Sequence, residues 1–172
     1  MKPMIRTALI YGTIATAIIT LFFWLTHTFW IEENDFSMGE ILGYVSMILA
    51  FTMIYFGVRS YRNLQPEQKI SFGKAFLVGL AITIVASVWY VIGWMIYYQQ
   101  NPEIMNSFFE QSIEQVKQGD LSTAEMQAKI TEMEEFQASY QKPLVRIGFT
   151  LMEILPMGLV ISLASALILK RK

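Results

Sequence analysis

The run "AFLVGLAITIVASVWYVIGWMIYY", residues 75–98, contains no charged side chain. An α-helix needs about 20 predominantly apolar residues to cross the hydrocarbon core of a bilayer. Three further runs, residues 4–29, 41–61 and 145–169, are also long and apolar. The sequence therefore predicts an all-α protein built on a bundle of four transmembrane helices.

Composition agrees with a membrane protein. The chain is 54% hydrophobic and 16% charged, whereas soluble domains are about 45–50% apolar and about 25% charged. Its 172 residues suit one domain, so we expect a single membrane domain over residues 1–172. The absence of cysteine excludes disulfides, thiolate metal sites and cysteine nucleophiles. We expect residues 4–29 to be retained, because "LFFWLTHTFW", residues 21–30, offers no small-residue signal cleavage site.

Charge is segregated between the two sides of the four spans. One side carries nine of the thirteen basic residues and one acid, Glu67, whereas the other carries twelve acids and four bases. The nine basic residues are Lys2, Arg6, Arg59, Arg62, Lys69, Lys74, Lys170, Arg171 and Lys172. Since Lys and Arg favour cytoplasmic loops, the sequence predicts that both termini are cytoplasmic.

The polar segment between spans three and four, residues 101–141, predicts an extracytoplasmic hairpin of two amphipathic helices. We expect Asn101 to cap the first helix, Pro102 to take its first position, and Gly119 to end it in a left-handed conformation. Ser122 and Glu125 have the spacing of a capping box at the start of the second. Pro143 then predicts a bend before span four.

The apolar side chains of this hairpin fall on one face of each predicted helix. They are Ile104, Met105, Phe108, Phe109, Ile113 and Val116, then Met126, Ile130, Met133, Phe136 and Tyr140. These faces either bury against each other and the mouth of the bundle or form a docking surface for a protein partner. Few basic residues accompany them, so we do not expect the hairpin to lie flat on lipid.

Small residues recur every four positions along the spans and predict close helix packing. The rows are Ala8, Gly12, Thr16 and Thr20; Gly39 and Gly43; Gly79, Thr83 and Ser87; and Gly158, Ser162 and Ala166. A row not covered within the chain would join copies into a homo-oligomer. Residues 38–49 and 151–163 both contain Glu-Ile-Leu, which leaves open an internal duplication of two hairpins.

Glu153 lies inside the apolar run of span four, three residues before Pro156. A carboxylate within the hydrocarbon core of a bilayer costs about 2.5–3.5 kcal/mol to insert, so we expect Glu153 to face the bundle interior. Pro156 has no amide hydrogen and leaves the Met152 carbonyl without its helical donor. Arg146 is two turns away on nearly the same face. His27, Glu40 and Tyr44 are placed at comparable depth and are further candidate partners.

No zinc-protease, phosphate-loop, nucleophile-elbow or dinucleotide motif occurs in the chain. We therefore expect no enzymatic activity, no cofactor and no metal site. The expected partners are the lipid bilayer, a protein bound through the hairpin and a second copy of the chain, with no nucleic acid.

Three strings resemble a known bacterial membrane family, the domain of unknown function 4199. They are "GEILGYVSMILAFTMIYFGVRSYR" at residues 39–62, "ISFGKAFLVGLAITIVASVWYVIGW" at 70–94 and "EILPMGLVISLASALILKRK" at 153–172. The positions that match the family pattern are Glu40, Gly43, Tyr44, Arg62, Phe72, Gly73, Glu153, Pro156 and Gly158. The resemblance implies a four-helix integral membrane protein of bacteria and implies nothing about its activity.

Two functional hypotheses follow. The first is a non-enzymatic structural or accessory membrane component that uses the hairpin as a contact surface. The alternative is a small proton-coupled or ion-handling transporter in which Glu153 titrates. A transporter requires a wettable path to Glu153, whereas an accessory protein does not.

Overall fold

The computed structural model describes residues 2–29 and 36–171, except for the side chains of residues 27–29, 36–38 and 40. The described residues form six α-helices, a short 3-10 turn and no β-strand. The helices are α1 (Pro3–Phe29), α2 (Phe36–Asn63), α3 (Phe72–Gln100), α4 (Glu103–Gln118), α5 (Thr123–Tyr140) and α6 (Pro143–Leu169). The predicted all-α fold is confirmed.

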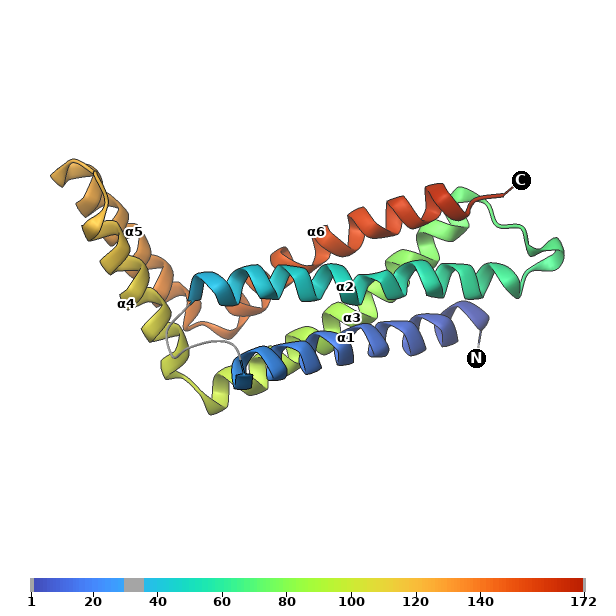
Figure 1. Ribbon diagram of the computed structural model, residues 1–172, viewed down its shortest axis with the longest axis horizontal. Coiled ribbons are helices and arrows are strands. Elements are labelled where there is room, and N and C mark those ends of the chain that lie inside the picture. Colours follow the sequence, from blue (N-terminus) through green and yellow to red (C-terminus); the bar gives the residue numbers. More distant parts are fainter. Residues whose placement is uncertain (1, 30–35, 172) are drawn as a thin grey trace.

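Helices α1, α2, α3 and α6 are long and apolar enough to cross a membrane. Figure 1 shows these four helices running alongside one another, with α4 and α5 projecting from one end as a hairpin. Both chain ends and the α2–α3 connection lie at the opposite end. At that end the N–H of Arg171 donates to the carbonyl of Ile70 over 3.0 Å, which joins the end of α6 to the connection.

Glycines set the closest helix contacts in the bundle. A Cβ added to Gly12 on α1 would lie 2.7 Å from the Cβ of Val85 on α3. One on Gly79 of α3 would lie 2.9 Å from Ser162 of α6, and one on Gly158 of α6 would overlap Thr83. The predicted small-residue packing is confirmed at these three positions. Gly43 differs, because a Cβ there would have no neighbour within 4 Å.

The core lies between these contacts, where Phe51, Ile54, Ile82 and Ile154 are fully buried. Hydroxyl groups within the core form hydrogen bonds between helices. The hydroxyls of Thr83 and Ser162 are 3.2 Å apart, and Thr16 donates to the Ala86 carbonyl over 3.1 Å. Bonds of this kind stabilise membrane bundles by about 0.6 kcal/mol each.

The hairpin matches the sequence prediction at the start of α5 and departs from it at both ends of α4. Ser122 and Glu125 form the expected capping box of α5. The side chain of Asn101 donates to the Tyr97 carbonyl and so caps α3, while Pro102 takes the N-cap position of α4. The left-handed prediction for Gly119 is wrong: its φ is −78° and its backbone is extended, because the chain leaves α4 toward Leu121, whose N–H donates to the Gly119 carbonyl.

The predicted bend before Pro143 is confirmed. Helix α5 ends at Tyr140 and α6 begins at Pro143, and the two helices diverge in Figure 1. Proline fits the first turn of α6 because an amide hydrogen at this position, which proline lacks, would have no intrahelical acceptor. The hairpin is thus directed away from the long axis of the bundle.

Candidate functional site

A cleft of about 310 Å³ opens where the bundle meets the base of the hairpin. Helix α3 contributes Tyr90 and Trp94, helix α5 contributes Phe136 and Tyr140, and helix α6 contributes Phe149, Thr150 and Glu153. The wall therefore combines five aromatic rings, of which Tyr90 and Tyr140 carry phenol hydroxyls, with the Thr150 hydroxyl and the Glu153 carboxyl group. This is the candidate functional site, called the mouth cleft below.

Aromatic contacts hold the hairpin against the bundle at this cleft. The Phe136 ring of α5 meets the Phe149 ring of α6 edge-on, with centroids 4.5 Å apart, and lies 5.7 Å from Phe109 of α4. Edge-to-face ring pairs contribute about 0.5–1.5 kcal/mol beyond the area they bury. The Trp94 Nε1–H of α3 also donates to the Tyr140 hydroxyl of α5 over 2.8 Å. The hairpin is thereby joined to both α3 and α6.

Arg146 is 6% exposed and connects α5 to α6. Its Nε and Nη2 donate to the Tyr140 carbonyl over 3.3 Å, and Nη2 donates to the Gln141 carbonyl over 3.1 Å. Its guanidinium carbon lies 3.4 Å from the centroid of the Tyr98 ring. A cation at the C-terminal end of a helix satisfies the last carbonyls and the helix dipole. The guanidinium of Arg146, which the sequence predicted as a candidate partner of Glu153, is thus bound to the C-terminal end of α5.

Glu153 does not face the bundle interior as the sequence predicted; its side chain is exposed in the single chain. The buried row of α6 is Thr150, Ile154, Gly158 and Ser162, spaced every four residues. Successive helical residues are rotated by about 100°, which places Glu153 to one side of that row. It shares an exposed stripe with Phe149, Pro156 and Val160. The carboxyl group therefore forms part of the cleft wall.

The remaining predicted site residues differ in their exposure and in their distance from the mouth cleft. Tyr44 of α2 is 43% exposed, and both Tyr44 and Glu153 lie within electrostatic range of Tyr90. Helix α6 continues through Pro156, which is exposed on the side of α6 that carries Glu153. The side chains of His27 and Glu40 lie outside the described residues.

The hydroxyl of Tyr140 is kept in its protonated form. Burial raises the pKa of Tyr140, the hydrogen bond from Trp94 and the charge of Arg146 lower it by less, and the charge of Glu153 raises it again. A phenol protonated at neutral pH donates one hydrogen bond and still accepts others. Tyr140 can therefore accept from Trp94 and donate to a group in the cleft.

The sequence prediction did not include the aromatic residues of α3 among the candidate site residues. Tyr90 and Trp94 are four residues apart, as are Phe136 and Tyr140. Side chains at that spacing lie on the same face of a helix. Two such aromatic pairs on neighbouring helices were the available signal for a shared pocket.

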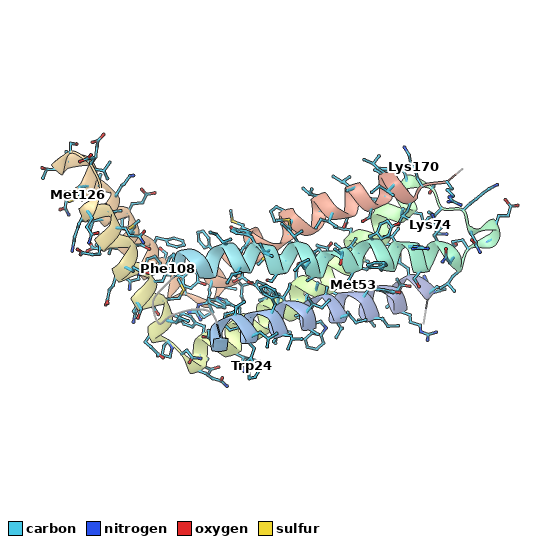
Figure 2. The ribbon with its side chains drawn as sticks, in the orientation of Figure 1. Trp24, Met53, Lys74, Phe108, Met126 and Lys170 are labelled. Atoms are coloured by element: carbon cyan, nitrogen blue, oxygen red, sulfur yellow. The ribbon has the colours of Figure 1, made fainter. Side chains whose placement is uncertain are left out.

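The opposite end of the bundle is basic. Arg62 is buried near the C-terminal ends of α2 and α6, and its Nη1 lies 3.5 Å from the Leu169 carbonyl. Lys74 and Lys170 lie at this end, far from the hairpin (Figure 2). Among the described residues, no group of three or more His, Asp or Glu side chains could hold a metal ion.

Comparison with known proteins places the chain in a family. Curated proteins and solved structures gave no match. The family model described as "Protein of unknown function (DUF4199)" matches residues 10–171, which is nearly the whole chain. The hairpin, the mouth cleft and most of the four long helices lie within the matched range. The chain belongs to the DUF4199 family.

Proposed function

We propose that the chain is a non-enzymatic structural or accessory component of the bacterial cytoplasmic membrane, with the α4–α5 hairpin as its contact surface for another protein. The observation that carries this proposal is the projection of the hairpin beyond the bundle (Figure 1). Figure 2 places Met126 near the far tip of the hairpin and Phe108 nearer the bundle. A projecting element of this kind presents surface that the bundle does not cover.

The surface of the hairpin supports contact with a partner. A groove of about 330 Å³ is lined by Val116 of α4 and by Lys129, Glu132, Met133 and Phe136 of α5. Residues 101–141 carry eight acidic side chains and two lysines. Complementary charge promotes association and selects partners. We therefore expect the partner to present an apolar segment flanked by basic residues.

The charge asymmetry supports an orientation with both termini in the cytoplasm and the hairpin outside. In the sequence, the segments that join spans one and two and spans three and four, with the adjoining ends of the spans, carry twelve acids against four bases, and the remaining segments and span ends carry nine bases against one acid. The positive-inside rule assigns the basic end to the cytoplasm. The hairpin would then meet partners on the extracytoplasmic side.

Packing favours the accessory role over transport through the bundle. Helix α6 continues inward from Glu153 with Ile154, which is fully buried together with Ile82 and Ala86 of α3. Protein interiors packed in this way exclude water. A proton or ion that reached Glu153 would meet apolar side chains and the hydroxyls of Thr83 and Ser162, which already bond to each other. This supports a role for Glu153 at the surface of the bundle.

Orientation is tested by labelling single cysteines, since the chain has none of its own. Ala128→Cys lies at an exposed position of α5, and Glu67→Cys lies in the α2–α3 connection. A membrane-impermeant maleimide applied to intact spheroplasts is expected to label Ala128→Cys, while Glu67→Cys reacts after lysis. The reverse pattern would overturn the proposed orientation.

The contact surface is tested by site-specific photo-crosslinking in native membranes. A photoreactive residue at Met133, in the hairpin groove, is expected to give one discrete adduct with another protein. The same residue at Glu135 is the matched control, because two residues of rotation place it on the far side of α5. Equal adducts at both positions, or none at Met133, would contradict a specific contact surface.

A further inference from the structure

We propose that the mouth cleft binds the ammonium group of a phospholipid with an ethanolamine headgroup. This inference goes beyond the contact role of the hairpin and rests, as that role does, on the four long helices crossing a bilayer. The cleft then lies at the membrane surface, where headgroups are found, whichever leaflet the hairpin faces.

The wall of the cleft has the chemistry that recognises an organic cation. Aromatic ring faces carry negative electrostatic potential and attract ammonium groups, and several rings around one site form an aromatic cage. Tyr90, Trp94, Phe136, Tyr140 and Phe149 supply five rings here, and Glu153 supplies the opposite charge. A carboxylate accepts about four hydrogen bonds, so Glu153 can bind an ammonium alongside its contacts within the protein.

A primary ammonium also needs hydrogen-bond acceptors, and the cleft offers hydroxyl oxygens besides Glu153, among them that of Thr150. The Thr150 hydroxyl uses its hydrogen to donate to the Arg146 carbonyl over 2.9 Å, so its oxygen can accept a further bond. The positive charge of Arg146 is turned away, toward the carbonyls that end α5 and the ring of Tyr98. The charged side chain that lines the cleft is therefore that of Glu153, which is negative.

The surface beside the cleft favours a lipid over a free amine. The exposed stripe of α6 continues from Phe149 and Glu153 to Pro156 and Val160, and Val160 is 61% exposed. Met152, adjacent to Glu153, is 70% exposed. On a membrane-spanning helix this apolar surface faces acyl chains. Ligand pockets have volumes of about 300–1,000 Å³, so a cleft of about 310 Å³ suits a headgroup whose chains remain outside it.

Native mass spectrometry of the full chain in a neutral detergent tests the proposal. Dioleoyl phosphatidylethanolamine is titrated in one arm, dioleoyl phosphatidylglycerol, which has no ammonium group, in the second, and free ethanolamine in the third. We expect one phosphatidylethanolamine to bind at least about tenfold more tightly than phosphatidylglycerol, as a charge-assisted hydrogen bond contributes about 1.5–3 kcal/mol. Equal affinities for the two lipids would overturn the proposal. If free ethanolamine bound as tightly as phosphatidylethanolamine, the ligand would be a free amine and the assignment to a lipid would be overturned.

Two variants assign the preference to the cleft. Glu153→Gln keeps the size of the side chain and removes its charge, and it is expected to abolish the tenfold preference. Tyr90→Leu removes one ring of the cage and is expected to weaken binding severalfold, which provides a second test if Glu153→Gln does not fold. Glu134→Gln, at an exposed position of α5 that lines neither the cleft nor the hairpin groove, is the matched control and keeps the wild-type preference. A full preference in both cleft variants would overturn the proposal even if the hairpin crosslinks as expected.

Discussion

The two ends of the molecule are built in different ways. At the end that holds both termini, the structure brings together basic side chains such as Arg62, Lys74 and Lys170. Toward the hairpin, aromatic rings replace close contacts of small residues, and the mouth cleft opens. A tightly packed interior has one stable arrangement, whereas an open, ring-lined end can accept a ligand or partner. The hairpin end is therefore the part of the molecule suited to binding.

The largest difference is expected between two glycines of α6. A Cβ on Gly158 would overlap Thr83, whereas a Cβ on Gly148, nearer the hairpin, would have no neighbour within 4 Å. Gly158→Ala should reduce the free energy of unfolding by about 1–3 kcal/mol through overpacking. Gly148→Ala should leave it unchanged or raise it by up to about 1 kcal/mol, because alanine favours helix. Unfolding in mixed micelles with increasing dodecyl sulfate measures both, and equal losses would remove the contrast in packing.

The two buried arginines provide the next comparison. Arg146 makes three hydrogen bonds to carbonyls at 3.1–3.3 Å, whereas Arg62 makes one at 3.5 Å, and its Nε has no hydrogen-bond partner among the described residues. Arg146→Met should cost about 2–3 kcal/mol, because charge-assisted hydrogen bonds are lost. Arg62→Met should change stability by less than about 1 kcal/mol, since removing a desolvated charge offsets the lost contact. The same micelle titration decides, and a larger loss at Arg62 would contradict this account.

Two serine caps allow a smaller comparison. Ser122 begins α5 with a complete capping box, and Ser71 begins α3 with one bond, from the Lys74 N–H over 3.4 Å. Ser122→Ala should destabilise α5 by about 1 kcal/mol. Ser71→Ala should have less effect, because α3 is held along its length by the bundle. Amide hydrogen exchange in the first turn of each helix measures the difference, and a larger acceleration in α3 than in α5 would reverse the expected order.

The smallest effect is a pH dependence confined to the hairpin. The Ser122 hydroxyl and N–H donate to Glu125 and hold the pKa of that carboxyl below its usual value. This stabilisation is fully present above the usual glutamate pKa and is lost as pH falls through the lowered value. The protection of the α5 amides, taken as the intrinsic exchange rate divided by the observed rate at the same pH, should therefore fall on acidification, and Glu125→Gln should flatten that part of the profile. An unchanged profile in Glu125→Gln would assign the pH effect elsewhere.

The overall fold was predictable because each part of it depends on local sequence. Long apolar runs specify the four long helices, and Ser122 with Glu125 specifies the start of α5. Gly119 was predicted in the wrong conformation, because several backbone paths can close a short turn after the same glycine. Asn101 caps α3 instead of α4, since the two helices are separated by only two residues and one side chain cannot serve both.

The candidate site was predictable only in part. The sequence singled out Glu153 as unusual, but the face of α6 that meets its neighbours depends on where Gly158 fits against Thr83. That fit turns Glu153 toward the cleft. Likewise, Gly43 and Gly79 both occur in small-residue rows, yet only Gly79 meets another helix closely. Periodicity identifies a face of one helix, whereas the site is formed by the pairing of faces from three helices.

The hydrogen bond from Trp94 to Tyr140 allows tryptophan fluorescence to report on the junction between the hairpin and the bundle. Indole emission depends on the hydrogen bonding of the ring nitrogen, so Trp94 reports whether the hairpin is seated without any attached dye. A version of the chain that retains Trp94 and carries phenylalanine at the other three tryptophans would show departure of the hairpin as a spectral change. Binding of a lipid in the cleft and of a protein on the hairpin could then be followed on the same molecule in real time.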